Sequence, residues 1–145
     1  MEISESISIA QSPELIWKFW MPVSTDVQWR SGITKAELTS PPPYGVGTTG
    51  IHYHKDLGPM PWTSIKWEEG RHMEWVCEDS LMKGAIGFYH VEPENDGSRV
   101  TMQSTMAPPF FMRIIMVFMA GVIRKSMKGD LQKLKSIMEK QDNYG

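Results

Sequence analysis

The longest regular pattern of apolar positions lies at the C-terminal end of the sequence, between Phe110 and Lys140. No proline interrupts this stretch, which follows Pro108 and Pro109 directly. Its apolar side chains recur in steps of three and four residues, at Met116, Ala120, Ile123, Met127, Leu131, Leu134 and Met138. That spacing places one apolar stripe along one side of a helix. Since about thirty helical residues span roughly 45 Å, we expect the helix to cross the whole fold.

The residues before this helix show the pattern of short strands. Ile3, Ile7 and Ile9 fall on one side of an alternating stretch, which predicts a strand over residues 2–10. Ser12 and Pro13 are favoured at the N-cap and the first position of a helix, so a short helix should follow and end at Met21. A second helical turn is expected at residues 25–29. Further strands are predicted at residues 33–39, 47–55, 62–68, 71–78, 83–92 and 98–106.

Turn residues set the connections between these strands. Gly58-Pro59 should separate the strand that ends at residue 55 from the one that begins at residue 62. Glu69-Gly70 and Asn95-Asp96-Gly97 should each form the turn of a hairpin. Within residues 47–55, Ile51 and Tyr53 would face the interior, with His52 and His54 on the solvated face. The predicted fold is α+β: a seven-stranded curved antiparallel sheet wrapped around a long C-terminal helix, with one or two short helices after the first strand.

Composition and charge narrow the function classes. A chain of 145 residues suits one domain, residues 1–145, and its net charge of −2 gives no general attraction to nucleic acid. Residues 124–140 are an exception, with six Lys or Arg side chains against Asp130 and Glu139. Cations are favoured near a helix C-terminus, which is the simpler interpretation. The alternative is a patch that meets an anionic surface.

Cysteine usage and the N-terminal residues point to the cytoplasm. Cys77 is the single cysteine, so an intrachain disulfide and a cysteine metal cluster are excluded. Residues 1–6 show neither a basic start nor an apolar run typical of a secretion signal. Cys77 shares a predicted strand face with Met73 and Trp75, and we expect it to be an inert, buried thiol. No cofactor is expected.

The order of elements and several local motifs together resemble the START-like, or SRPBCC, superfamily with its helix-grip fold. Its polyketide cyclase/dehydrase and lipid-transport-like branch is the most similar. The resemblance covers nearly the whole chain. The residues that carry it are Ser12-Pro13-Glu14 with Trp17, Trp29, Gly45-Val46-Gly47-Thr48, Trp67-Glu68-Glu69-Gly70-Arg71, Glu92-Pro93, Asp96-Gly97-Ser98-Arg99-Val100-Thr101, Asp130-Leu131 and Leu134-Lys135.

The resemblance implies an internal cavity between the sheet and the final helix that binds an apolar small molecule: a lipid, a polyketide or an aromatic compound. It does not imply a reaction, because the superfamily includes carriers, receptors and cyclases. A cyclase, aromatase or dehydratase acting in the same cavity is the alternative function. An interaction protein that uses its surface, like the chaperone regulators of the superfamily, is a third.

Candidate cavity-lining residues are the aromatic, methionine and basic side chains of the predicted inner faces. Twelve methionines and six tryptophans would suit a cavity for an apolar ligand. The candidates are Trp29, Tyr53, Trp62, Trp67, Trp75, Tyr89, Met102, Arg113 and Met116. Tyr53, Tyr89 and Arg113 are the possible acid–base or anion-binding groups, with packing or solvent exposure as the alternative roles. No catalytic residue is assigned.

No metal site is expected from the sequence. His52 and His54 share a predicted strand face, but no third ligand can be assigned to complete a coordination sphere.

Residues 110–119 are apolar nearly all round, which a single sheet cannot cover. The stretch is too short to span a bilayer. We therefore expect part of the 110–123 segment to be exposed in the monomer and covered by a second subunit. A transient membrane contact and a purely internal position are the other interpretations.

Overall fold

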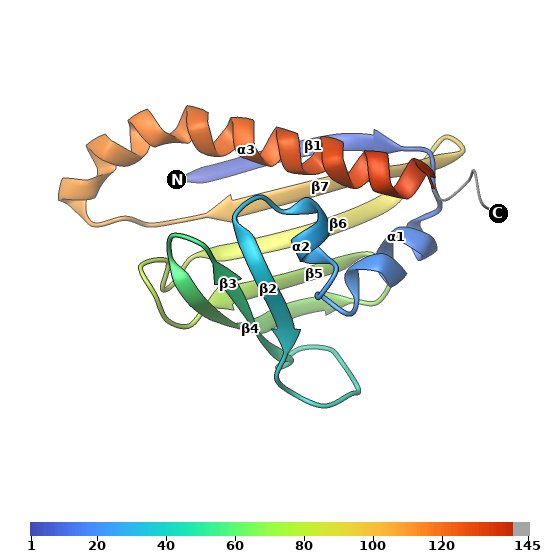
Figure 1. The fold of residues 1–145 in the computed structure, drawn as a ribbon, viewed down its shortest axis with the longest axis horizontal. Coiled ribbons are helices and arrows are strands. Elements are labelled where there is room, and N and C mark those ends of the chain that lie inside the picture. Colours follow the sequence, from blue (N-terminus) through green and yellow to red (C-terminus); the bar gives the residue numbers. More distant parts are fainter. Residues whose placement is uncertain (141–145) are drawn as a thin grey trace.

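The sheet of this protein has β1 at one edge and β2 at the other (Figure 1). A computed structural model describes residues 1–140. Seven antiparallel strands follow the spatial order β1-β7-β6-β5-β4-β3-β2. Their bounds are β1 Glu2–Ile9, β2 Ile33–Leu38, β3 Thr49–His54, β4 Gly58–Glu68, β5 His72–Cys77, β6 Ile86–Glu94 and β7 Gly97–Thr105. Apart from the link between β1 and β7, neighbouring strands are consecutive in sequence, so the sheet is built largely of hairpins.

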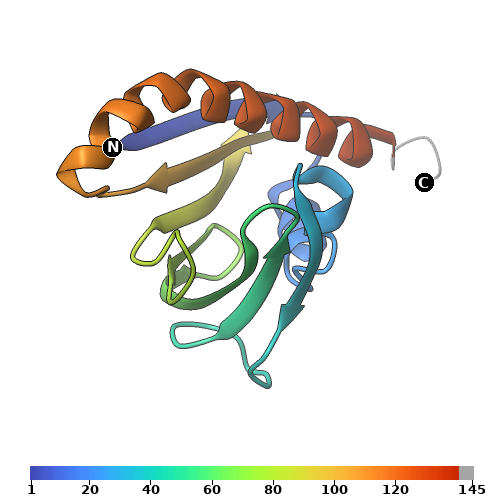
Figure 2. The same ribbon diagram turned by 60° about the vertical axis from the view of Figure 1, so that its left-hand side comes forward.

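Three α-helices lie on the concave side of the curled sheet (Figures 1 and 2). Helices α1 (Pro13–Trp20) and α2 (Asp26–Trp29) connect β1 to β2. After a 3₁₀ turn at Phe110–Met112, helix α3 (Arg113–Lys140) runs along β1 and contacts α2. The N-terminal end of α3 projects past the sheet (Figure 1). The predicted α+β helix-grip architecture is confirmed.

Local sequence chemistry sets the start of α1. The Ser12 hydroxyl accepts a hydrogen bond from the Leu15 amide at 3.2 Å, and Pro13 occupies the first turn. Both features satisfy or remove amide donors that would otherwise lack partners at a helix start. The cap directs Ile16, Trp17 and Trp20 into the core.

Two clusters of buried side chains fill the concave side. The larger cluster combines residues of β1, β5, β6, β7, α1, α2 and the C-terminal half of α3. The smaller one consists of Val23, Ile33, Ala36 and Trp62, near the β2 edge. Trp75 on β5 packs against both clusters.

Two strands begin three or four residues away from their predicted starts. Strand β4 begins at Gly58 rather than Trp62, so Gly58-Pro59 starts a strand instead of lying between two strands. Both Pro59 and Pro61 pair in register with β3. Strand β6 begins at Ile86 rather than residue 83, because residues 81–84 form a turn with Gly84 at a φ of 87°.

Candidate functional site

A buried carboxylate lies where α2 meets the concave face of the sheet. Asp26, the first residue of α2, is 1% exposed. Its Oδ1 accepts a hydrogen bond from Trp29 Nε1 at 3.2 Å. Its Oδ2 lies 2.7 Å from His52 Nε2 and accepts a second bond from the Tyr89 hydroxyl at 3.0 Å. A buried carboxylate needs such donors because it has lost its hydration.

The contacts of His52 define which of its nitrogens carries the proton. Trp62 Nε1 lies 2.8 Å from His52 Nδ1, and an indole N–H can only donate. Nδ1 therefore accepts, and Nε2 carries the hydrogen that is donated to Asp26. Both ring nitrogens are thus used within the protein.

Arg30 and Tyr89 complete this polar group. Arg30 Nη1 donates to the Tyr89 hydroxyl at 2.8 Å, while Arg30 Nε is buried with no partner among the described residues. Burial opposes the charge of Arg30, but the interactions with Tyr89 and Asp26 prevail and raise its pKa. Burial also raises the pKa of Tyr89 well above its usual range, so the phenol is a neutral hydrogen-bond donor.

A groove of about 600 Å³ opens next to this polar group, between the C-terminal end of α2 and the middle of α3. Its lining includes Trp29, Arg30 and Ser31 on one side and Val122, Ser126 and Asp130 on the other. Asp130 accepts a hydrogen bond from the Ser31 amide at 3.0 Å. Burial raises the pKa of Asp130, against the effect of these Ser31 contacts. We call this feature the α2–α3 groove.

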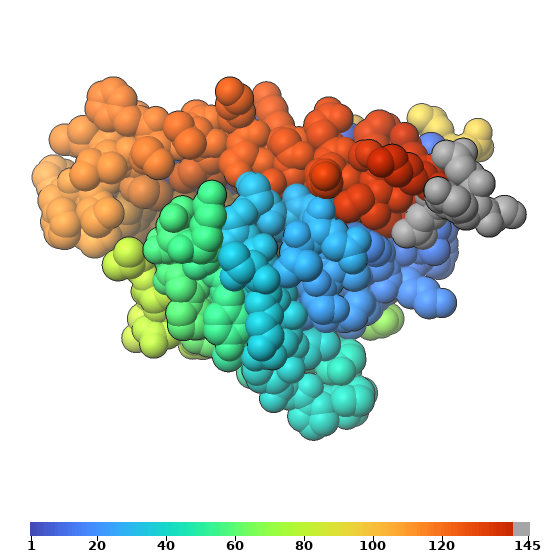
Figure 3. Space-filling model, in the orientation of Figure 1, coloured from blue at the N-terminus to red at the C-terminus, as the bar shows by residue number. Residues whose placement is uncertain are grey.

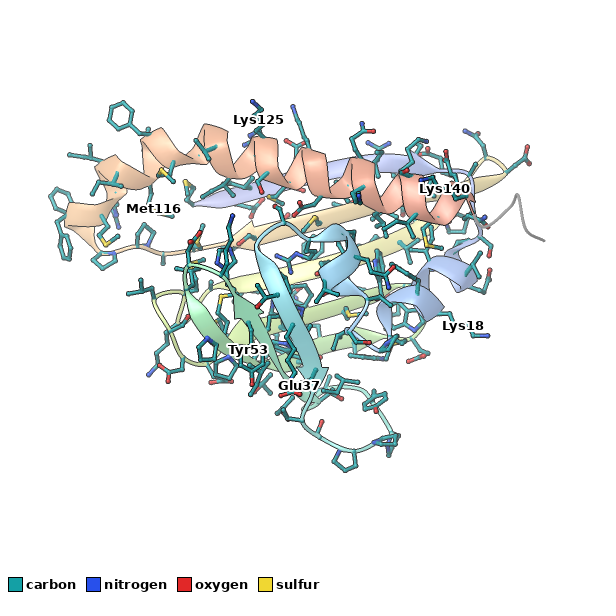
Figure 4. All side chains as sticks on the ribbon, viewed as in Figure 1. Lys18, Glu37, Tyr53, Met116, Lys125 and Lys140 are labelled. Atoms are coloured by element: carbon teal, nitrogen blue, oxygen red, sulfur yellow. The ribbon has the colours of Figure 1, made fainter. Side chains whose placement is uncertain are left out.

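The predicted inward orientation of Tyr53 is wrong. Tyr53 pairs with Lys35 across β2 and β3, its hydroxyl donates to Glu37 at 3.3 Å, and Lys35 lies over its ring. Tyr53 and Glu37 lie together on the outer side of the sheet (Figure 4). His52 takes the inner side, because Asp26 and Trp62 give it two hydrogen-bond partners there.

Five of the predicted site residues do come together on the concave face. The ring of Tyr89 lies 5.4 Å from Trp29 and 4.7 Å from Trp75, between centroids. Trp75 in turn lies 6.4 Å from Trp62, and Met102 pairs with Tyr89 across β6 and β7. Trp29, Trp62, Tyr89 and Met102 are buried, whereas Trp75 is partly exposed.

The other three predicted residues lie apart from this set. Trp67 packs on Trp17, with 5.6 Å between ring centroids, and its indole donates to Glu69. Arg113 and Met116 line a small pocket of about 320 Å³ with Met1, Pro108 and Val117, near the N-terminal end of α3. Arg113 is exposed and Met116 is partly buried.

Sequence reasoning missed Asp26, His52 and Arg30. One local signal was available for Asp26: it precedes Trp29 by three residues, so a helical turn places its carboxylate next to the indole N–H. The contacts of His52 and Arg30 join segments far apart in sequence, so no spacing could have indicated them.

Two further histidines form a separate pair across β5 and β6, with 3.0 Å between His72 Nδ1 and His90 Nδ1. Within residues 1–140, no group of three or more His, Cys, Asp or Glu side chains is arranged to hold a metal ion. Cys77 is buried, as expected, and its thiol donates to the Asp79 carbonyl at 3.0 Å.

Comparisons with known proteins agree with this architecture. The family model described as "Polyketide cyclase / dehydrase and lipid transport" matches residues 1–139. A search of curated proteins gives no match.

Three solved structures illustrate the shared fold. XoxI from Bacillus cereus is 15% identical, with a TM-score of 0.76 over 97% of both chains. The Aha1 dimer from Colwellia psychrerythraea is 17% identical, with a TM-score of 0.67 over 96% of both chains. The di-domain ARO/CYC StfQ of the steffimycin biosynthetic pathway is 11% identical, with a TM-score of 0.76; the match covers 98% of this chain and 51% of that one. At these identities the likeness shows the fold alone.

The family membership follows from the family model, which matches nearly the whole length of the chain. The protein belongs to the polyketide cyclase/dehydrase and lipid-transport family.

Proposed function

We propose that this protein binds a hydrophobic small molecule between the N-terminal half of α3 and the concave face of the sheet. The observation that carries the proposal is a change along the inner stripe of α3. Met127, Leu131, Leu134 and Met138 are buried, but Met116, Ala120 and Ile123 on the same stripe are only partly buried. The side of α3 that faces the sheet is therefore incompletely covered over its N-terminal half.

The sheet offers a matching apolar surface. Trp75 lies on the concave face, packs against both core clusters and is still partly exposed. A Cβ at Gly87 on the neighbouring strand would lie 2.9 Å from Cζ2 of this indole, so the glycine leaves room for the ring to lie across β6. An apolar wall with few polar groups is typical of small-molecule sites.

Arg113 gives the proposed site one charged group at its end. It lines the 320 Å³ pocket with Met116, next to the partly covered part of the stripe. A guanidinium suits a carboxylate or phosphate. The proposed ligand is therefore an apolar molecule, and an acidic group at one end of it would be favoured.

Binding is a better interpretation than acid–base catalysis by the buried histidine. A general base needs a free lone pair within reach of the substrate. His52 has none, because Nδ1 accepts from Trp62 and Nε2 donates to Asp26. Asp26 and its hydrogen-bond partners, which we call the Asp26 group, instead fix α2 to the sheet and shape the concave face.

The proposal is tested by filling the space with a side chain. Ala120→Trp places an indole on the inner stripe, and we expect it to weaken binding of the fluorescent fatty acid cis-parinaric acid at least tenfold. Gln132→Trp adds the same side chain to an exposed position of α3 and should leave binding unchanged. Circular dichroism would confirm that both variants fold. Equal binding by Ala120→Trp and the wild type, or no binding by the wild type, would contradict the proposal.

A cyclase or dehydratase activity is the second candidate, and one observation favours it. Arg30 lines the α2–α3 groove and bonds to the Tyr89 hydroxyl, and its buried Nε has no partner among residues 1–140. A fixed cation next to a phenol can stabilise an enolate oxygen. The test is conversion of a linear poly-β-ketone thioester to an aromatic product, which Arg30→Met should abolish; no conversion by the wild type would exclude this candidate.

A further inference from the structure

We propose that the N-terminal half of α3 docks on an anionic lipid surface, with its apolar side chains in the interface and the following lysines on the lipid headgroups. The apolar part of this docking surface has seven side chains that are each more than half exposed: Phe110, Phe111, Ile114, Ile115, Val117, Phe118 and Val122. They cover the 3₁₀ turn and the N-terminal end of α3, which stand out from the rest of the molecule (Figure 3). The surface differs from the ligand site proposed above, which lies on the inner stripe of α3.

The lysines of α3 continue the same outer face. Lys125 follows Phe118 by seven residues, which is two helical turns, and it points away from the sheet (Figure 4). Lys128 and Lys133 are also exposed. Within residues 1–140, none of these three lysines forms an ion pair, whereas Arg124 and Lys135 bind Glu5 and Glu139.

The helix dipole does not account for this charge. Its effect is confined to the last turn of a helix. Lys125 lies fifteen residues before Lys140, the last residue of α3, so it is about four turns from that end. No acidic residue occurs between Phe110 and Arg124, and the exposed Arg113 adds a further cation. The surface is therefore apolar at its tip, basic beside the tip and free of acidic groups along 110–124.

The lengths fit interfacial docking rather than insertion across a bilayer. No helix within residues 1–140 is both long and apolar enough to span a membrane. The apolar part, residues 110–122, extends roughly 20 Å at about 1.5 Å per residue. An apolar face combined with basic residues is the arrangement that gives reversible binding to anionic membranes. Charge complementarity selects an anionic surface over a neutral one.

The test is flotation of the full chain with vesicles of phosphatidylcholine alone and of phosphatidylcholine with phosphatidylserine. We expect binding to the anionic vesicles only, weakened when salt is raised. The double variant Phe111→Ser/Phe118→Ser should lower the partition coefficient at least tenfold. Lys125→Glu/Lys128→Glu should lower it at least about twenty-fivefold, because one lysine near an anionic surface is worth about fivefold.

Matched control variants distinguish binding through this surface from non-specific binding of the protein to vesicles. Leu81→Ser removes an exposed apolar side chain from the loop before β6, and Lys18→Glu/Lys83→Glu reverses two exposed lysines elsewhere. Neither should reduce binding by more than twofold. Circular dichroism and binding of cis-parinaric acid, retained in the Phe111→Ser/Phe118→Ser variant, would show that the fold and the inner site are intact.

Three outcomes would overturn the proposal. Equal binding to neutral and anionic vesicles would remove the role of the lysines. Absence of vesicle binding by a monomeric wild type would remove the docking surface. Absence of vesicle binding by a dimer that Phe111→Ser/Phe118→Ser converts to a monomer, seen by light scattering, would assign the surface to a second copy of the chain.

Discussion

His52 on β3 donates its Nε2 hydrogen to Oδ2 of Asp26 on α2 across 2.7 Å, and both residues are buried. This bond joins a four-residue helix, too short to be stable alone, to the far half of the sheet. The same carboxylate binds Trp29 and Tyr89, so one side chain fixes three elements of the concave wall.

Asp26→Asn should destabilise the protein by about 3 kcal/mol, because the nearby, partly buried Arg30 loses a compensating charge and one of the three donors faces an amide NH₂ instead of an acceptor. Urea unfolding at neutral pH measures the difference. Asp56→Asn, at an exposed position, is the control and should change the unfolding free energy by less than about 0.5 kcal/mol. Equal effects of the two substitutions would show that the Asp26 group does not stabilise the fold.

The imidazole of His52 should carry its hydrogen on Nε2 and not on Nδ1 in the folded protein. The reason is the indole of Trp62, which occupies Nδ1 as a donor. Long-range ¹H–¹⁵N correlation spectra of the histidine ring report the tautomer directly. A protonated Nδ1 would mean that the Trp62 contact is absent in solution.

Two carboxylates of α3 should influence stability with opposite pH dependence. Burial raises the pKa of Asp130, so in the folded protein it holds its proton to higher pH than in the unfolded chain. Its contribution to stability therefore falls as pH rises above the ordinary aspartate range, near pH 4. The Ala10 amide and Lys135 lower the pKa of Glu139, so its contribution is present above about pH 4.5 and is lost as pH falls.

Urea unfolding near pH 3.5 and near pH 7 checks both signs. As the pH rises from about 3.5 to about 7, the unfolding free energy of Asp130→Asn should increase relative to that of the wild type. Over the same interval, the unfolding free energy of Glu139→Gln should decrease slightly relative to that of the wild type. The change is small because the Glu139 carboxylate is close to solvent. Parallel curves for the wild type and both variants would refute the electrostatic account of α3.

Gly87→Ala should destabilise the protein by about 1–3 kcal/mol, because the added methyl group would force the Trp75 indole away from β6. Gly121→Ala is the counterpart on α3. Nothing lies within 4 Å of a Cβ there, so better helix propensity should stabilise the protein by up to about 1 kcal/mol. Thermal unfolding compares the two, and a neutral Gly87→Ala would show that Trp75 does not lie against that strand.

The long-range architecture was predictable because its signals are local and repeated. Steps of three and four residues identified α3, and the Ser12-Pro13 pair identified the start of α1. The expectation that part of residues 110–123 is exposed in the monomer is also confirmed. What covers this segment stays a proposal.

The phase of β3 was not predictable by the same means. Alternation favoured Ile51 and Tyr53 for the inner side, since both are more apolar than His52. His52 lies on the inner side instead, because its two ring nitrogens bond to Trp62 and Asp26 there. Gly50 on the same face leaves space for the Trp62 indole. A hydrogen-bonded group formed by α2, β3 and β4 outweighed the burial of two more apolar side chains.

The most direct test of the proposed ligand site is a titration of ¹³C-methyl-methionine-labelled protein with oleate, followed by methyl NMR. The protein should respond at Met102 on β7 and at Met116 on the inner stripe of α3, while Met138 in the buried half of α3 stays unchanged. Shifts confined to Met112 in the exposed 3₁₀ turn and Met119 on the exposed side of α3, or no shifts at all, would contradict a ligand site between α3 and the sheet.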